Sequence, residues 1–202
     1  VERNLVAEFI RFSPFNRNEH LAHPLTTVLP NRDLAVTHLP SNEVALRGTL
    51  GPKTRNMLRK AEREGLVHRE LPLPDHLPAF RALYEETMRR NNAPEFFWYD
   101  DAYWNHLLAL GSHGLRLFGV YAGPQLVAAA MAVAHGRSGL YHLGASLTEY
   151  AKLGAGNLSL YAMSCGEECP GIPDVYELTV DQGGRKSVPP DEDEEPGEDD
   201  EG

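Results

Sequence analysis

Apolar stretches separated by short glycine-containing turns dominate the middle of the chain. Residues 115–121, 126–135 and 140–143 are such stretches, and residues 122–125 and 136–139 separate them. Runs of this length and composition are typical of strands, and strands joined by tight turns pair as an antiparallel meander. Helical periodicity precedes and follows the meander. The pattern therefore predicts a mixed α/β (α+β) domain whose largely antiparallel sheet is flanked by helices.

The remaining predicted elements lie on both sides of the meander. Strands are expected at residues 6–12, 34–39, 68–73 and 174–180. Side-chain caps predict helices that begin after Ser41, Thr54, Asp75, and Asp100 or Asp101. The residues expected on the inward side of these helices are Val44 and Leu46; Met57, Leu58 and Ala61; Leu77, Phe80, Tyr84 and Met88; Tyr103, Trp104, Leu107 and Leu108.

A glycine-containing turn joins the last strand of the meander to a further predicted helix. The turn consists of Lys152, Leu153, Gly154, Ala155, Gly156 and Asn157. One face of the helix after it is formed by Leu158, Tyr161, Ala162 and Cys165. Unpaired N–H groups at a helix start can hold an anion, such as a pyrophosphate or the oxygen of a reacting carbonyl. Two glycines are a weak motif, so the pattern also fits a tight loop between two core elements.

A basic stripe runs along the helix predicted at residues 55–64. Arg55, Arg59 and Arg63 recur every four residues, and Lys53 lies just ahead of them. The arginine fork grips two phosphate oxygens at once, so the stripe fits phosphate binding. The alternative is a solvated helix face on which opposite charges pair one turn apart.

Composition removes several function classes. The formal charge of −10 is concentrated in residues 191–202, which hold nine acidic residues, so the rest of the chain is nearly neutral and gives no reason to expect DNA binding. Neither the two cysteines nor His20 with His23 has further ligands at a suitable spacing, so no metal site is expected. No apolar run is long enough to span a bilayer and no signal peptide opens the chain, which predicts a cytoplasmic protein without a transmembrane segment.

Several segments taken together resemble the FemAB-like proteins, the peptidoglycan interpeptide-bridge aminoacyltransferases and their relatives. Residues 53–65 are similar to the basic helix of that family. Residues 81–88, 141–146 and 150–154 look like further parts of the same module, in the same order. The resemblance implies acyltransferase folds of the GNAT type, arranged as two tandem domains.

The resemblance also implies a domain organisation. Residues 1–51 would be the C-terminal part of a first GNAT-like domain, and residues 52–184 would be an incomplete second one. Residues 185–202 would be an acidic, disordered tail. The chain thus looks incomplete at both ends, and activity of this chain alone does not follow from the resemblance.

The activity that the resemblance implies is acyl transfer to an amine. Family members of known activity take an aminoacyl group from a charged tRNA and pass it to an amine of a peptidoglycan precursor in cell wall biogenesis. The first alternative is a GNAT N-acetyltransferase that uses acyl-CoA, and the second is an inactive truncated remnant or an interaction module. Either donor would be a co-substrate, and no permanently bound cofactor is implied.

This chemistry needs donors for a tetrahedral oxyanion and a route for the amine proton. The residues expected to hold the acyl donor and its oxyanion are Lys152, Gly154, Ala155, Gly156 and Asn157. Those expected to bind substrate phosphates are Lys53, Arg55 and Arg59. Tyr141 and His142 are the candidates for catalysis, although strand histidines are more often structural. The aromatic run at residues 96–99 would either line a substrate groove or pack its loop onto the sheet.

Overall fold

The computed structural model describes residues 12, 18–29, 34–40, 42–135, 138–165 and 177–181, with only the backbone described at 34, 35, 113 and 177–181. Contacts divide the chain into two compact units, residues 1–34 with 181–202, and residues 35–180. The 3₁₀ helix η1 (Asn18–Leu21) belongs to the first unit. The acidic tail, and the strand expected at 6–12 apart from Phe12, lie outside the described residues.

The second unit contains the sheet and its helices, except for Leu34 and Asp181 at the ends of two strands. The elements in chain order are β1 (Leu34–His38), α1 (Glu43–Thr49), α2 (Pro52–Arg63), β2 (Leu66–Glu70), α3 (Leu77–Arg90), η2 (Glu95–Phe97), α4 (Asp101–Leu108), α5 (Gly111–Gly114), β3 (Leu115–Ala122), β4 (Gln125–His135), β5 (Ser138–Ser146), α6 (Thr148–Ala151), α7 (Ala155–Ser164) and β6 (Glu177–Asp181). Among the described residues, no helix combines the length and apolar character needed to cross a bilayer.

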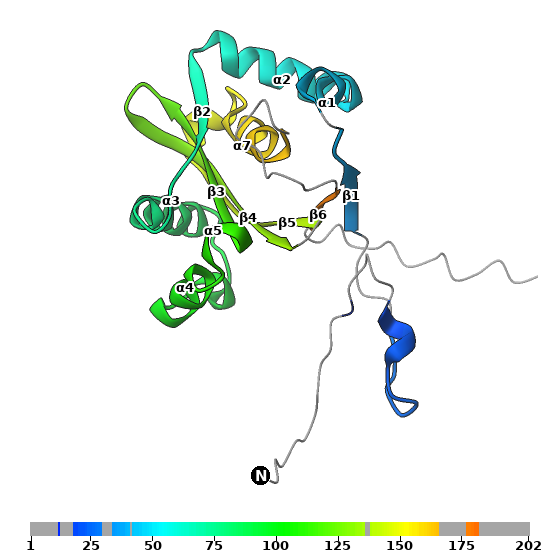
Figure 1. Cartoon of the computed structure of the whole chain (residues 1–202). Coiled ribbons are helices and arrows are strands. Elements are labelled where there is room, and N and C mark those ends of the chain that lie inside the picture. The colour runs from blue at the N-terminus through cyan, green and yellow to red at the C-terminus, as the bar shows by residue number, and fades with distance from the viewer. Residues whose placement is uncertain are drawn as a thin grey trace, which may run out of the picture. The chain divides into compact units, whose positions relative to one another are not determined.

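Six strands form one sheet in the order β1-β6-β5-β4-β3-β2 (Figure 1). β2, β3, β4 and β5 pair antiparallel, and the hairpin between β3 and β4 ends with Ala122 opposite Gln125. β6 pairs with β5 in the parallel sense, from Ser138 opposite Glu177 to Tyr141 opposite Val180. The predicted mixed, largely antiparallel sheet flanked by helices is confirmed.

Helices cover both faces of the sheet, with α1, α2 and α7 on one face and α3 and α4 on the other (Figure 1). Neighbouring strand residues point to opposite faces. The core beneath α7 therefore contains Phe118, Val120, Ala128 and Ala130, and the core beneath α3 contains Leu117, Ala129 and Met131. Burial on both faces explains why β3 and β4 read as nearly continuous apolar runs.

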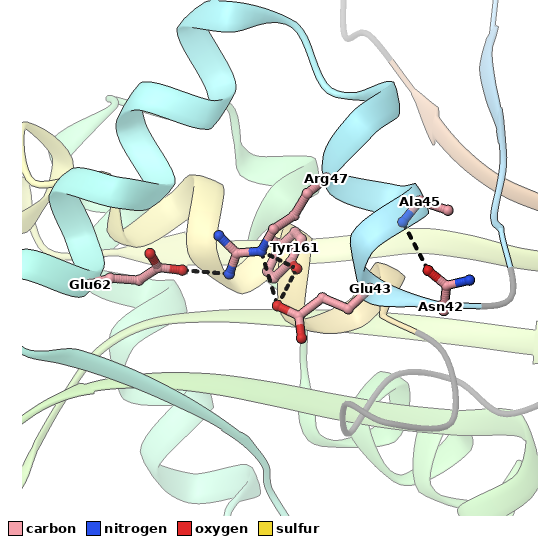
Figure 2. Close-up of polar contacts among 6 residues, drawn as sticks. All are labelled: Asn42, Glu43, Ala45, Arg47, Glu62 and Tyr161. Atoms are coloured by element: carbon pink, nitrogen blue, oxygen red, sulfur yellow. Dashed lines mark hydrogen bonds and ion pairs between the residues drawn. The ribbon is translucent and has the colours of Figure 1, made fainter.

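The first helix has a different cap and a narrower buried side than predicted. Oδ1 of Asn42 accepts a hydrogen bond from the backbone N–H of Ala45 at 2.9 Å and caps α1 (Figure 2), whereas Ser41 was expected to do so. Leu46 is buried as predicted, but Val44 is 83% exposed, so its predicted place in the core is wrong. Two residues span about 200° around a helix, so Val44 and Leu46 lie on different sides.

The next three helices begin close to the predicted residues. α2 begins at Pro52 rather than after Thr54, because proline suits the first helical position. α3 begins at Leu77, slightly later than the expected cap at Asp75. The side chain of Asp100 caps α4, as one of the two predicted alternatives.

A polar cluster joins α1 to α2 and α7 (Figure 2). Nε of Arg47 donates to Oε1 of Glu43 and to the Tyr161 hydroxyl, both at 2.9 Å, and Nη2 donates to Oε1 of Glu62. The Tyr161 hydroxyl in turn donates to Glu43 at 2.7 Å. Burial raises the pKa of Tyr161, and the hydrogen bond to Glu62 raises that of Arg47. These contacts extend across residue 51, where a domain boundary was predicted; the boundary itself stays a prediction.

Candidate functional site

Strand β5 carries a β-bulge at His142. In the ladder with β4, Tyr141 and Leu143 pair with consecutive β4 residues, which leaves His142 as the extra residue. Leu143 belongs to the core beneath α3, and His142 also lies on that side, where its Nε2 is 2.6 Å from the Tyr103 hydroxyl of α4. Tyr141 packs against the core beneath α7. The bulge therefore places the two catalytic candidates on opposite faces of the sheet.

A pocket of about 370 Å³, here called the α7 pocket, opens beside the start of α7. It is lined by Thr87, Arg90, Asn91, Ala129, Tyr141, Gly144, Ala145, Ser146, Ala151, Gly156, Asn157, Ser159 and Leu160. Arg90, at the end of α3, supplies a cationic group, and its Nη1 donates to the Ser146 carbonyl oxygen at 2.7 Å. The start of a helix also favours negative charge, so this end of the pocket suits an anionic or developing anionic group.

The two glycines of the turn have different environments. Gly154 caps α7 with φ at +88°, in the left-handed region that favours glycine. A Cβ at Gly154 would lie 2.6 Å from the carbonyl oxygen of Met57, so the glycine also permits close approach of α7 to α2. A Cβ at Gly156 would meet no atom within 4 Å, and Gly156 lines the α7 pocket. Gly154 thus shapes the backbone, and Gly156 keeps the pocket open.

Of the other residues expected to hold the acyl donor, one lines the α7 pocket and two do not. Asn157 lines the α7 pocket together with Gly156. Ala155 is buried in the core, and the side chain of Lys152 is exposed. The carbonyl oxygen of Lys152 accepts a hydrogen bond from Nζ of Lys60 at 2.8 Å, which ties the turn to α2. The pocket thus brings together two of the five predicted donor residues.

A second pocket, of about 410 Å³, lies on the α3 side of the bulge and is here called the aromatic pocket. Its lining consists of Tyr84, Met88, Asn91, Ala93, Pro94, Phe97, Tyr99, His142, Leu143 and Gly144. Asn91 and Gly144 line both pockets, so the two cavities meet at this place. A Cβ at Gly144 would lie 1.8 Å from the Tyr141 hydroxyl oxygen, so a side chain at this position would require the Tyr141 ring to shift.

The aromatic run at residues 96–99 both packs its loop and lines a groove. Phe97 and Tyr99 line the aromatic pocket, and Tyr99 stacks on Tyr103 with ring centroids 3.8 Å apart. Phe96 is 71% exposed, and Nε1 of Trp98 donates to the Ala93 carbonyl oxygen at 3.2 Å. Packing of the loop and lining of a groove, which the sequence left open as alternatives, therefore both occur in this run.

The titratable groups around the bulge are held in their uncharged forms. Burial lowers the pKa of His142, so its imidazole is neutral at pH 7. Burial raises the pKa of Tyr141, Tyr84 and Tyr103, so these remain phenols. The aromatic pocket is thus an apolar environment with a neutral imidazole at its wall.

The basic stripe lies away from both pockets. Lys53 and Arg59 are exposed on α2, and Nη1 of Arg59 is 3.4 Å from Oδ1 of Asn56. The guanidinium of Arg55 donates to the carbonyl oxygen of Leu50. None of the three predicted phosphate-binding residues lines either pocket. A phosphate-binding role for the stripe therefore stays a prediction.

Three residues of the α7 pocket come from the end of α3 and were missed at the level of sequence. They are Thr87, Arg90 and Asn91. Thr87 is buried, and its Oγ1 accepts a hydrogen bond from the Ser146 N–H at 3.2 Å. The sequence showed only an apolar helix face followed by a polar end, with no sign that this end meets β5. Within the described part of the chain, no group of three or more His, Cys, Asp or Glu residues could hold a metal ion.

This chain spans about half the length of the solved structures whose fold it matches. The structure of FemX matches with a TM-score of 0.59 and 14% identity, over 76% of this chain and 54% of the FemX chain. A conserved protein of unknown function from Bacteroides thetaiotaomicron matches with a TM-score of 0.50 and 16% identity, over the same 76% and 54%. At these identities the likeness concerns the fold. A search of curated proteins gives no match.

The family itself is shown by the sequence. The profile of the acetyltransferase (GNAT) domain matches residues 52–166, more than half of the chain. The matched segment runs from the start of α2 past the end of α7, so it contains the bulge, the glycine turn and both pockets. The predicted GNAT-type acyltransferase family is confirmed, and the FemX likeness agrees with its FemAB-like fold. The chain belongs to the acetyltransferase (GNAT) domain family.

Proposed function

We propose that this protein transfers an acyl group to an amine, with the acyl donor in the α7 pocket and the amine in the aromatic pocket. The observation that carries the proposal is the meeting of the two pockets at Asn91 and Gly144, beside the bulge of β5. Two reactants that enter from opposite sides would bring the carbonyl carbon and the amine nitrogen together at this wall.

The donor side offers polar groups of the right kind. The first N–H groups of α7 and the guanidinium of Arg90 favour a phosphate or an oxyanion. β6 pairs with β5 only as far as Tyr141, so in the described part of the chain residues 142–146 have no partner on that edge. Main-chain groups along this edge are available to an extended donor. The Ser146 carbonyl is already used by Arg90 and Thr87.

Two donors are compatible with this arrangement. The first candidate donor is charged tRNA, which the resemblance to the FemAB-like proteins implies, with an amine of a peptidoglycan precursor as acceptor; the fold is shared with FemX. Lys53, Arg55 and Arg59 would then contact phosphates outside the pockets. The family description supports a second candidate, an N-acetyltransferase that takes its acyl group from acyl-CoA. In both reactions the new bond is an amide.

The test offers both donors to the same protein. One reaction contains charged tRNA and a nucleotide-linked muropeptide, and the other contains acetyl-CoA and the same muropeptide; mass spectrometry then detects the added acyl mass. The expected result is an amide product from one donor, which also decides between the two candidates. Failure of both donors with folded protein would overturn the proposal.

A matched pair of variants locates the reaction. Gly156→Glu places a carboxylate in the α7 pocket and should abolish both donor binding, measured by calorimetry, and product formation. Gly48→Glu places the same side chain on the exposed surface of α1, where a Cβ meets nothing within 4 Å, and should leave both unchanged. Product formation by Gly156→Glu at the wild-type rate would show that the donor binds elsewhere.

A further inference from the structure

The aromatic pocket and the α7 pocket differ in charge. Among the described residues that line the aromatic pocket, none carries a carboxylate, an ammonium or a guanidinium group. In the described lining of the α7 pocket, the guanidinium of Arg90 is such a group. A charged group that enters the aromatic pocket would therefore lose water without gaining a charged partner, which is unfavourable for any ion.

Polar atoms in the wall of the aromatic pocket are already paired within the protein. The Tyr84 hydroxyl donates to the carbonyl oxygen of Phe97 at 3.0 Å, and Nε2 of His142 lies 2.6 Å from the Tyr103 hydroxyl. The rings of Tyr84 and Tyr99 stack with their centroids 5.8 Å apart. These contacts hold the loop after α3 in place, and they use hydrogen-bonding capacity that a strongly polar ligand would otherwise need.

Apolar surface continues outside the aromatic pocket at Phe96 and Phe97. Phe97 lines the pocket and is 36% exposed, and Phe96 beside it is 71% exposed. Their ring centroids lie 4.1 Å apart. The pocket volume of about 410 Å³ is in the range of sites for small organic molecules. An apolar body that is longer than the pocket can thus extend from it over the exposed ring of Phe96.

The wall shared by the two pockets favours the reactive form of an amine. Acyl transfer needs the neutral amine, and both an apolar environment and a nearby cation lower the pKa of an amine. Arg90 lines the α7 pocket and directly precedes Asn91, which lines both pockets. The amide of Asn91 is neutral, and its oxygen can accept an N–H of the amine. The described part of this wall therefore suits a neutral amine.

We propose that the acceptor is a primary amine on an uncharged apolar body, either an alkyl chain or an aromatic ring, with no carboxylate beside the amine. The inference rests on the proposed function and narrows its acceptor. A small arylalkylamine and the ε-amine of a peptide-linked lysine have this chemistry, whereas the α-amine of a free amino acid does not. The nitrogen forms a bond to the acyl carbon, the bond from that carbon to the leaving group breaks, and the proton lost by the nitrogen ends on the leaving group.

Three amines that differ at one carbon test the exclusion of the carboxylate. 2-Phenylethylamine, phenylalaninamide and phenylalanine carry, next to the amine, no substituent, a neutral amide and a carboxylate. With the donor that proves active, mass spectrometry measures kcat/KM for each, expressed per concentration of neutral amine. We expect similar values for the first two and a value at least about tenfold lower for phenylalanine. Equal values for phenylalanine and phenylalaninamide would overturn the proposal.

A fourth amine distinguishes the two sources of the same chemistry. Nα-acetyllysine methylamide presents the ε-amine of a peptide-linked lysine without any carboxylate. A kcat/KM above that of 2-phenylethylamine would support a peptide acceptor, and a lower one would support a small arylalkylamine. Acylation of the muropeptide without acylation of any of these amines would overturn the proposal.

Met88→Arg supplies the charged partner that the aromatic pocket lacks. Met88 lines the pocket from α3, so an arginine there can pair with a carboxylate beside the amine. The kcat/KM of phenylalanine relative to phenylalaninamide should rise by about tenfold. Ala82→Arg adds the same side chain at an exposed position of α3 outside the pocket lining and should leave this ratio unchanged. An unchanged ratio in folded Met88→Arg would contradict the proposal.

The outcomes separate the acceptor class from the proposed function. Circular dichroism shows whether Met88→Arg is folded, and if it is not, the amine series with the wild type decides the acceptor class. A wild type that acylates phenylalanine as readily as phenylalaninamide rejects the acceptor class and leaves acyl transfer standing. If the wild type transfers no acyl group to any amine, the proposed function fails and the acceptor class with it.

Discussion

Gly154→Ala is expected to destabilise the fold strongly, whereas Gly156→Ala, two residues later, should not. Gly154 has φ at +88°, and its missing side chain faces the Met57 carbonyl oxygen across the contact between α7 and α2. Gly156 has neither feature. The pair therefore separates the backbone role of the glycine turn from its role in the α7 pocket.

The magnitude for Gly154→Ala follows from two terms. A left-handed backbone costs alanine about 1–2 kcal/mol. The added Cβ would lie 2.6 Å from a main-chain oxygen that cannot rotate away, so α7 and α2 must move apart, and overpacking of this kind costs about 1–3 kcal/mol. Restriction of the unfolded chain returns about 0.4–1 kcal/mol. The net loss in the free energy of unfolding is therefore about 1–4.5 kcal/mol.

The control should behave in the opposite way. Alanine at Gly156 meets no atom within 4 Å and replaces a helical glycine, so stability should rise by up to about 1 kcal/mol. Its methyl group enters the α7 pocket, so donor affinity should fall even though the fold is intact. Loss of binding without loss of stability is the signature of a pocket residue.

Urea denaturation measures both variants. Trp104 is 3% exposed in the core beneath α3 and provides a fluorescence signal for unfolding. The midpoint should fall for Gly154→Ala and stay or rise for Gly156→Ala, with unchanged slopes. Equal stability of Gly154→Ala and the wild type would refute the account of the α7–α2 contact, and a large loss in Gly156→Ala would refute the open space at that position.

Two further predictions concern the polar cluster and its surroundings. Arg47→Met removes the hydrogen bonds to Glu43, Glu62 and Tyr161. Because the arginine is partly exposed, the free energy of unfolding should fall by about 1–2 kcal/mol, and by less at high salt. Urea denaturation at two salt concentrations measures both effects. Nδ1 of His68 is buried without a hydrogen-bond partner in the described structure, and burial lowers the pKa of His68. The unfolded chain therefore binds the proton more readily than the folded chain, so the free energy of unfolding should fall as the pH drops below about 6.5. His68→Leu should lose less stability than the wild type between pH 7 and pH 5, and identical pH dependence would contradict this.

Local sequence signals were sufficient for much of the fold. The apolar runs and the turn at residues 122–125 correctly predicted the antiparallel meander, because a hairpin is encoded by adjacent residues. The face formed by Leu158, Tyr161, Ala162 and Cys165 is buried as the helical spacing predicted. The misplaced Val44 did not follow from that spacing, because Val44 and Leu46 are two residues apart and therefore lie on different sides of the helix.

The site depended on contacts that sequence spacing does not contain. The unequal roles of Gly154 and Gly156 follow from the approach of α2, which precedes them by about a hundred residues. The position of His142 follows from the register between β4 and β5, and a one-residue shift in register leaves no trace in composition. Arg90 reaches the pocket only because α3 packs across β5.

The attachment of α1 has a consequence for how this domain can be moved between proteins. The family match begins at residue 52, but Leu46 is 1% exposed in the core beneath α7, and Arg47 bridges Glu62 and Tyr161. A segment that begins at residue 52 would lack the buried Leu46 side chain. It would also lack Arg47, so Glu62 and Tyr161 would lose their hydrogen-bond partner. A segment meant to fold outside this protein should therefore include α1, although the family match begins after it. A segment chosen by sequence similarity alone would have a partly exposed hydrophobic core.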